Sequence, residues 1–398
     1  MNMSTRRSFL KQSALATSAW LIPGFLKAFD GKPMPAGEKR LVVIQLSGGN
    51  DGLNTVVPYR NDVYYQVRPQ LGLPASSVIK VHDELGFHPA LEKLARLYHQ
   101  GELAVLNNVG YPNPDRSHFR SMDIWHTAAD SSEYLSTGWL GRFLDARCHD
   151  CAAGHLAIEV DDVLTLALKG ERQKGMALRN PKRLHDTLQA PLFQELAAID
   201  AHGEEPSVSY LYKTLAQTVS SAEYIYSQTG KVASGAEYPA TDFAGRLKTI
   251  AQLIHSGIDT RVYYASLSGF DTHVRQLNEH ERLLKVFAEA VDALVTDLKK
   301  HGVFDDTLIL VFSEFGRRVA QNASAGTDHG TANNLFLIGS HLRQQGFVNG
   351  TPDLKQLEQG DLIHTLDFRS VYATVLDRWL QADADRILGK SFARLDLV

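Results

Sequence analysis

The stretch LVVIQLSGGNDGLNTVVPY, residues 41–59, indicates both the fold class and the place of a functional site. Its first six residues are mostly apolar, as expected of a strand that is buried on both faces of a sheet. A glycine pair, an asparagine and then Asp51 follow, and another glycine comes directly after the carboxylate. A carboxylate at the end of a buried strand needs a positively charged partner or a function to account for it, because side chains are few there and the backbone is exposed.

Three interpretations of Asp51 can be compared. A phosphate-binding loop is disfavoured because the stretch lacks the G-x-G-x-x-G spacing and has no lysine after the glycines. Its negative charge would also repel a phosphate unless a cation intervened. A nucleotide-binding protein built on this loop is disfavoured for the same reason. Two interpretations stay open from this stretch alone, a metal ligand and a simple turn residue of the kind that Asn-Asp-Gly sequences often supply.

Short apolar runs bounded by polar or glycine turns recur along the chain and read as buried parallel strands. They lie at residues 41–46, 103–109, 155–160, 260–267, 307–312 and 334–339. Helical patterns alternate with them, for example from Pro89 to Gly101 and over residues 279–300. This alternation predicts a single α/β domain over residues 40–398, with a mostly parallel sheet and helices on both faces. Residues from about 161 to 256 are more helical and more polar, and predict a helical insertion.

Carboxylates and imidazoles gather at the ends of these predicted strands. In open α/β sheets ligands bind at the carboxyl ends of the strands, so we expect residues that follow the strands to share one site. After Asp51, these residues are Ser117 and His118, Asp271 and His273, Glu314, and the pair Asp328 and His329 directly before the last strand. Such side chains are the usual ligands of zinc, manganese or iron. The sequence therefore predicts a divalent-metal site.

The N-terminus predicts export. TRRSFLK, residues 5–11, precedes a short apolar stretch that reaches about Ala28, and it resembles a bacterial twin-arginine signal. The apolar run is shorter than the roughly 20 residues of a membrane span, so no transmembrane helix is expected in the mature chain. A short membrane-surface helix and an uncleaved anchor stay open. By this resemblance the signal is residues 1–28, the export machinery is a partner, and the mature protein is periplasmic or envelope-facing.

Composition narrows the function classes. The chain has 41 Lys and Arg against 45 Asp and Glu, a formal net charge of −4, which argues against nucleic acid as a partner. Its two cysteines, Cys148 and Cys151, end a predicted helix, so a local disulfide or two idle thiols are favoured over a redox pair. They are too few for a zinc site made of four thiolates.

The motifs named so far, together with RSHFRSMDIWHT, GFDTH, VFSEFGRR and GTDHGTANNLFLIG in that order, resemble the DUF1501 family. That family consists of twin-arginine-exported proteins related to the alkaline phosphatase and sulfatase superfamily, and the resemblance covers nearly the whole chain. It implies an alkaline phosphatase-like fold and a divalent metal, either zinc, manganese, calcium or iron. Asp51, Asp271, His273 and His329 would be metal ligands, with Glu314 and Asp328 as further candidates. Ser117 would be the nucleophile. The residue types also allow His118 or Arg116 to neutralise the non-bridging oxygens of the substrate.

The chain also departs from that superfamily. Where an Asp-His pair is common after the penultimate strand, this sequence has Glu314 and Phe315, and a phenyl ring cannot bind a metal. A two-metal site is therefore doubtful, and a single metal or a lost site becomes credible. Ser117 also has a plainer interpretation as a helix N-cap. Two functions follow. One is a metal-dependent hydrolase of small anionic phosphate or sulfate esters, and the other is a non-catalytic binding or assembly protein that contacts an envelope component.

Overall fold

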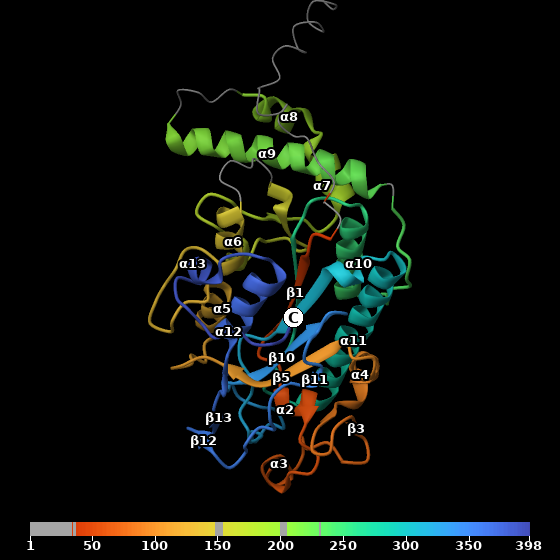
Figure 1. Ribbon diagram of the computed structural model, residues 1–398, viewed down its shortest axis with the longest axis vertical. Coiled ribbons are helices and arrows are strands. Elements are labelled where there is room, and N and C mark those ends of the chain that lie inside the picture. Colours follow the sequence, from red (N-terminus) through yellow and green to blue (C-terminus); the bar gives the residue numbers. More distant parts are fainter. Residues whose placement is uncertain (1–33, 35–36, 148–153, 200–204, 231) are drawn as a thin grey trace, which may run out of the picture.

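The computed structural model describes residue 34 and residues 37–147, 154–199, 205–230 and 232–398 (Figure 1). The predicted signal at residues 1–28 and both cysteines lie outside the described residues. The described part is organised around one large sheet, and its strands follow one another across the sheet in the order β11-β5-β10-β9-β1-β8-β6-β7, with β14 also paired to β5.

All six predicted strands are present in that sheet. They are β1 (Arg40–Ser47), β5 (Leu103–Gly110), β6 (Ala157–Glu159), β8 (Val262–Ser268), β9 (Thr307–Phe312) and β10 (Asn333–Ile338). Three short strands extend it, β7 (Met176–Ala177), β11 (Gly346–Phe347) and β14 (Leu366–Asp367). β1 lies in the middle, parallel to β8 on one side and to β9 on the other.

The direction of β10 corrects the prediction, because this strand runs antiparallel to both β9 and β5. A parallel neighbour would need a crossover connection, usually a helix, and residues 313–332, all of them described, contain no helix. An antiparallel strand begins at the edge where its parallel neighbours end. Asp328 and His329 precede β10 and therefore lie at the same edge as residues that follow the other strands.

Helices cover both faces of the sheet, as the sequence predicts. On one face, Val42, Ile44 and Leu46 of β1 share an apolar cluster mainly with buried residues of three helices, and on the other face Leu41 and Val43 share one mainly with residues of four. The first group is α4 (Glu92–His99), α10 (Asp242–His255) and α11 (Gln276–Lys300). The second group is α5 (His118–Thr127), α6 (Trp139–Arg147), α12 (Phe368–Thr374) and α13 (Ala384–Leu388). The alternation of side chains along β1 divides the core into these two layers.

The predicted helical insertion is divided between two roles. Three helices, α7 (Pro181–Leu188), α8 (Pro191–Ala197) and α9 (Pro206–Thr229), pack on one another at one end of the molecule (Figure 1). α10 belongs instead to the core, where its apolar side chains meet α11 and β8. No helix in the described ranges has the length and apolar character that crossing a membrane requires.

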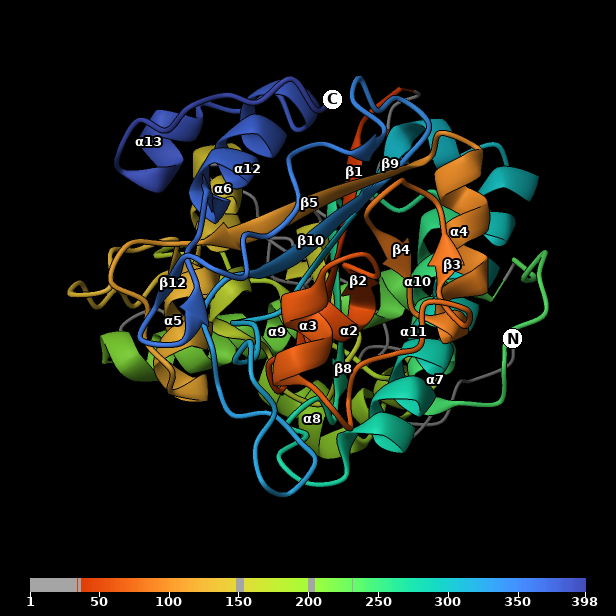
Figure 2. The same cartoon turned by 90° about the horizontal axis from the view of Figure 1, so that it is seen from below.

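Several short elements lie outside the large sheet. They are α2 (Gly52–Thr55), β2 (Val56–Val57), α3 (Asp62–Val67), β3 (Ile79–Lys80), β4 (Gly86–Phe87), β12 (Leu357–Glu358) and β13 (Asp361–Leu362). The strands β2, β4 and β3 form a small antiparallel sheet, and β12 and β13 form a hairpin. Seen from below, α2, α3 and β2 lie in front of the large sheet (Figure 2).

Candidate metal centre

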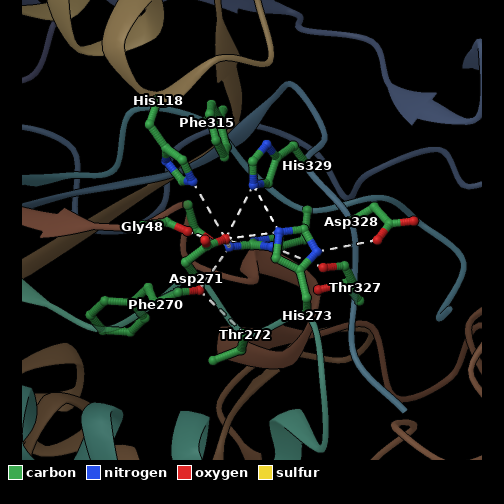
Figure 3. Close-up of polar contacts among 12 residues, drawn as sticks. Gly48, His118, Phe270, Asp271, Thr272, His273, Phe315, Thr327, Asp328 and His329 are labelled. Carbon is green, nitrogen blue, oxygen red and sulfur yellow. Dashed lines mark hydrogen bonds and ion pairs between the residues drawn. The ribbon is translucent and has the colours of Figure 1, made fainter. Parts of the chain in front are cut away.

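Three histidines converge on one carboxylate oxygen at this edge (Figure 3). Oδ1 of Asp271, which follows β8, lies 3.0 Å from Nε2 of His273, 3.1 Å from Nε2 of His329 and 3.4 Å from Nε2 of His118. The Nε2 atoms of His273 and His329 are themselves only 2.9 Å apart. His118 is the first residue of α5. Three distant segments of the chain thus bring four potential ligand atoms together.

The opposite ring nitrogen of each histidine, Nδ1, lies next to an oxygen that can only accept a hydrogen bond. These oxygens are Oε1 of Glu314 for His118, the carbonyl of Arg116 for His329 and Oδ1 of Asp328 for His273, at 2.9, 2.8 and 3.2 Å. Each Nδ1 must therefore carry the proton and donate it, so in the neutral rings each Nε2 presents a lone pair. Metal-binding histidines are commonly oriented by such carboxylate or carbonyl acceptors.

This arrangement fits a bound cation. With both protons on Nδ1, the Nε2 lone pairs of His273 and His329 face each other at 2.9 Å, and a metal ion or a proton between them would relieve their repulsion. Nε2 of His118 is buried and has no hydrogen-bond partner among the described residues. In a tetrahedral zinc site with bonds of about 2.0 Å, ligand atoms are about 3.3 Å apart. The separations measured from Oδ1 of Asp271 and between His273 and His329, 2.9 to 3.4 Å, are close to that value, and the atoms of His118, Asp271 and His329 all lie within 4.8 Å of one another.

The ionisation of Asp271 suits the same role. Burial alone would raise the pKa of this carboxyl, but the hydrogen bond and charge of Arg317, together with the neighbouring imidazoles, outweigh burial and lower the pKa to about 2. Nη2 of Arg317 lies 2.7 Å from Oδ1 of Asp271, and the arginine side chain is fully buried. Its guanidinium also donates to the carbonyls of Gly48, Gly49, Phe270 and Thr327. Arg317 therefore fixes the loops of the site and adds a permanent positive charge, which favours one bound metal ion over two.

Glu314, predicted as a ligand, lies behind His118. Its buried carboxylate accepts from Nδ1 of His118 and, at 2.8 Å, from the backbone N–H of Gly48. The neighbouring Phe315 ring lies 4.8 Å from the ring centres of both His118 and His329. Glu314 thus orients one candidate ligand, and Phe315 forms an apolar wall against two of them.

Asp51 has a different partner from the one expected. The sequence predicts that Asp51 is a metal ligand at the edge where the other candidate residues gather. Instead its Oδ2 lies 2.6 Å from Nη1 of Arg68, with both side chains buried. Burial raises the pKa of Asp51, but the Arg68 charge and hydrogen bond outweigh it, so the pKa falls below its ordinary value. The guanidinium supplies the positive charge that a metal ion would otherwise supply to this carboxylate.

Ser117 occupies the N-cap position of α5, and the residue is exposed. Its hydroxyl makes no capping hydrogen bond to the described helix, while its backbone N–H donates to Oδ1 of Asp115 at 2.7 Å. Ser117 therefore has the N-cap position that the sequence allows, but its hydroxyl does not act as a cap.

Sequence reasoning missed two contributors, the Arg317 guanidinium and the Arg116 carbonyl. Arg317 lies three residues after Glu314, in a run of two arginines that looks like a solvated pair. A backbone carbonyl carries no residue-specific signal. The sequence predicts that His118 contacts the substrate, whereas in the structure its Nε2 lies 3.4 Å from Oδ1 of Asp271, among the candidate metal ligands.

The geometry defines an α/β protein with a metal-competent histidine and carboxylate cluster at the sheet edge. The chain belongs to the family described as Protein of unknown function (DUF1501), whose model matches residues 38–390. Among curated proteins, none matches this sequence significantly.

Solved structures whose fold is similar to that of this chain include a member of the alkaline phosphatase superfamily and a sulfatase. The C-terminal periplasmic domain of EcEptC from Escherichia coli, in complex with Zn, is 11% identical, with 78% of this chain and 75% of that chain covered and a TM-score of 0.40. The PsFucS1 sulfatase from Pseudoalteromonas sp. is 12% identical, with 97% and 74% covered and a TM-score of 0.39. A protein in the alkaline phosphatase superfamily from Vibrio parahaemolyticus is 11% identical, with 78% and 63% covered and a TM-score of 0.35.

Proposed function

We propose that this chain is an exported, metal-dependent hydrolase of phosphate or sulfate esters that works in the periplasm or facing the cell envelope. The observation that carries the proposal is the convergence of three Nε2 lone pairs on Oδ1 of Asp271. His118, His273, His329 and Asp271 would hold one divalent ion. Three imidazoles favour zinc, manganese or iron, because calcium prefers oxygen ligands.

A divalent ion at this position would supply Lewis acidity, lowering the pKa of a hydroxyl or water and stabilising charge on an ester oxygen. The protein supplies the groups that orient the ligands and the candidate nucleophile. Glu314 and the Arg116 carbonyl hold His118 and His329 in the tautomer that leaves Nε2 free. The exposed hydroxyl of Ser117, one residue before His118, is our candidate nucleophile.

A second candidate is a non-catalytic envelope binding or assembly protein. The packing of the Phe315 ring against His118 and His329 favours it, because a two-metal site would need ligands for the second metal ion at this position. A protein of this kind would retain the metal for structural purposes.

Metal content tests the proposal first. Full-length protein purified without chelator should carry about one metal ion per chain by elemental analysis, and removing the ion should lower the melting temperature. His329→Ala and His273→Ala should each reduce the content. His185→Ala is the matched control, since His185 also pairs with a carboxylate, that of Glu223 at 2.8 Å, but on the helical insertion.

Turnover of 4-nitrophenyl phosphate and 4-nitrophenyl sulfate then separates the two candidates. Hydrolysis that disappears with the metal supports the enzyme. Stoichiometric metal without turnover of either ester favours the binding protein. No stoichiometric metal, together with no thermal shift on adding zinc, manganese or iron, would overturn the metal centre itself.

A further inference from the structure

One side-chain amide, that of Asn322, connects the loop before β10 with the segment that follows β8. Its Nδ2 donates to the carbonyl of His273 at 2.9 Å and to Oδ1 of Asp328 at 3.2 Å. Its Oδ1 accepts from the backbone N–H groups of Ser324 at 2.9 Å and Gly326 at 3.0 Å. Both ends of the amide are therefore engaged, and each end contacts a different part of the chain.

The surroundings of this amide define which end is the nitrogen. The carbonyl of His273 and the carboxylate of Asp328 can only accept hydrogen bonds, so they require the donor, and the two backbone N–H groups require the acceptor. A rotated amide would set oxygen against oxygen and N–H against N–H. The two halves of Asn322 consequently have separate roles. Its oxygen shapes the turn within residues 322–326, and its nitrogen reaches the candidate metal centre.

Backbone contacts already hold this turn against the segment that contains His273. The backbone N–H groups of Arg275 and Gln276 donate to carbonyls of the turn at 3.0 and 2.9 Å. Gly326 lies so close that a Cβ atom there would be 2.2 Å from the carbonyl of His273. The backbone therefore accounts for the position of the turn, and the amide nitrogen of Asn322 has a more local task at the candidate metal centre.

That task concerns the carboxylate of Asp328. Its side chain is 56% exposed, and its hydrogen-bond donors within the described ranges are Nδ1 of His273 and Nδ2 of Asn322. An exposed carboxylate held by one neutral imidazole can rotate toward water, because water offers it equivalent hydrogen bonds. The second donor, from Asn322, restricts this rotation and keeps the carboxylate beside His273.

Asp328 and Asp271 contact opposite edges of the His273 ring (Figure 3). While Asp328 accepts the proton of Nδ1, the Nε2 atom on the other edge can present a lone pair to the candidate metal centre. Without that acceptor, the proton can move from Nδ1 to Nε2, and the ring is free to turn. In either case His273 would no longer offer a ligand atom to the centre.

We propose that Asn322 is a positioning residue, whose amide holds the Asp328 carboxylate against Nδ1 of His273 and so keeps Nε2 of that ring available as a ligand. The inference rests on the proposed function for the bound metal ion. The hydrogen bond between Asp328 and His273 is a property of the protein with or without metal, so it can be measured separately.

Full-length protein with ¹⁵N-labelled histidine tests the inference by NMR after its metal has been removed. His273→Gln identifies the His273 resonances by their absence. In the wild-type protein, Nδ1 of His273 should carry a proton that exchanges slowly with water. Asn322→Asp keeps an acceptor for the turn but sets an oxygen against Asp328, so this proton should exchange about tenfold faster. Asn278→Asp, which adds the same charge at an exposed position of α11, should leave the exchange rate unchanged.

Two further variants separate positioning from a general loss of structure. Asn322→Ser removes the donor without adding a charge, and a serine hydroxyl can still accept from the turn, so the exchange should again become faster. Combining Asn322→Asp with Asp328→Asn restores a donor and an acceptor with their places exchanged, and should recover part of the slow exchange. A role of Asn322 confined to the turn would give no recovery.

Metal affinity separates this inference from the proposed function. Asn322→Asp should weaken metal binding by about 10- to 100-fold, measured by competition with a zinc chelator, as expected of a group that orients a ligand. Exchange that stays slow in both single Asn322 variants would overturn the inference, and bound metal in the same protein would leave the metal centre standing. Faster exchange in a protein that never holds a metal ion would support the inference and tell against the metal centre alone.

Discussion

Nδ1 of His118 lies 2.9 Å from Oε1 of Glu314, so a fully buried carboxylate orients the imidazole at the start of α5. Glu314→Gln keeps the size of the side chain and removes its charge. Because such outer carboxylates strengthen a histidine ligand, we expect metal affinity to fall by about 10- to 100-fold, measured by competition with a zinc chelator. Glu279→Gln, which removes an exposed carboxylate paired with Arg282 on α11, should leave the affinity unchanged. Equal affinities for the wild-type protein and Glu314→Gln would contradict this role of Glu314.

The buried pair of Asp51 and Arg68 should contribute to stability and not to metal binding. Asp51→Ala leaves the Arg68 guanidinium buried without its counter-charge, so the free energy of unfolding should fall by about 3–5 kcal/mol. Urea denaturation of metal-free protein measures the loss, and elemental analysis of the folded variant should still find the metal. Asp186→Ala, which breaks the exposed pair with Lys182, should change stability little. Loss of metal in Asp51→Ala without loss of stability would restore Asp51 as a ligand.

Ser117→Ala should barely affect stability, within about 0.5 kcal/mol, since the hydroxyl is exposed and makes no cap bond to the described helix. The comparison is Thr241→Ala, because the hydroxyl of Thr241 does accept from the backbone N–H of Ala244, at 3.2 Å, and removing such a cap costs about 0.5–2 kcal/mol. If Ser117 is the nucleophile, its variant alone loses ester hydrolysis. Full turnover in Ser117→Ala would instead indicate direct attack by water.

Glu159 on β6 should make stability depend on pH. Burial is the largest influence and raises its pKa from 4.5 to about 7, although the backbone N–H of Thr165 partly offsets this effect. A carboxyl with a raised pKa in the folded state stabilises the fold below pH 4.5, and that contribution is lost as the pH rises to about 7. The free energy of unfolding of metal-free protein should therefore fall over this range, by on the order of 2–3 kcal/mol. Glu159→Gln should remove most of the slope, and an unchanged slope would contradict the shift.

The sequence predicts the sheet well, because its strands are short apolar runs whose period and boundaries are local properties. It does not predict that β10 is antiparallel, since strand direction depends on how residues 313–332 return to the sheet edge. The edge itself was predicted correctly, because the residues before an antiparallel strand and those after a parallel strand lie together. The prediction that Asp271, His273 and His329 lie close together therefore holds, although it assumed the wrong direction for β10.

Residue type alone could not divide the carboxylates between candidate ligand, orienting group and ion-pair partner. Asp51, Asp271 and Glu314 all follow predicted strands, and their roles differ because of what stands opposite them, Arg68, three imidazoles and one imidazole respectively. Those partners lie far away in the sequence. Pairing of this kind is set by tertiary packing and leaves no local pattern.

The convergence of His118, Asp271 and His329 also has a consequence for how the protein is made. More than 200 residues of chain separate His118 from His329, and β5, β8 and β10 must all be in place before their flanking residues meet. An unfolded or partly synthesised chain cannot hold these donors at ligand distances. An ion that needs all of these donors would therefore be fully coordinated only once the sheet has formed, and a chain truncated before residue 329 would lack one candidate ligand.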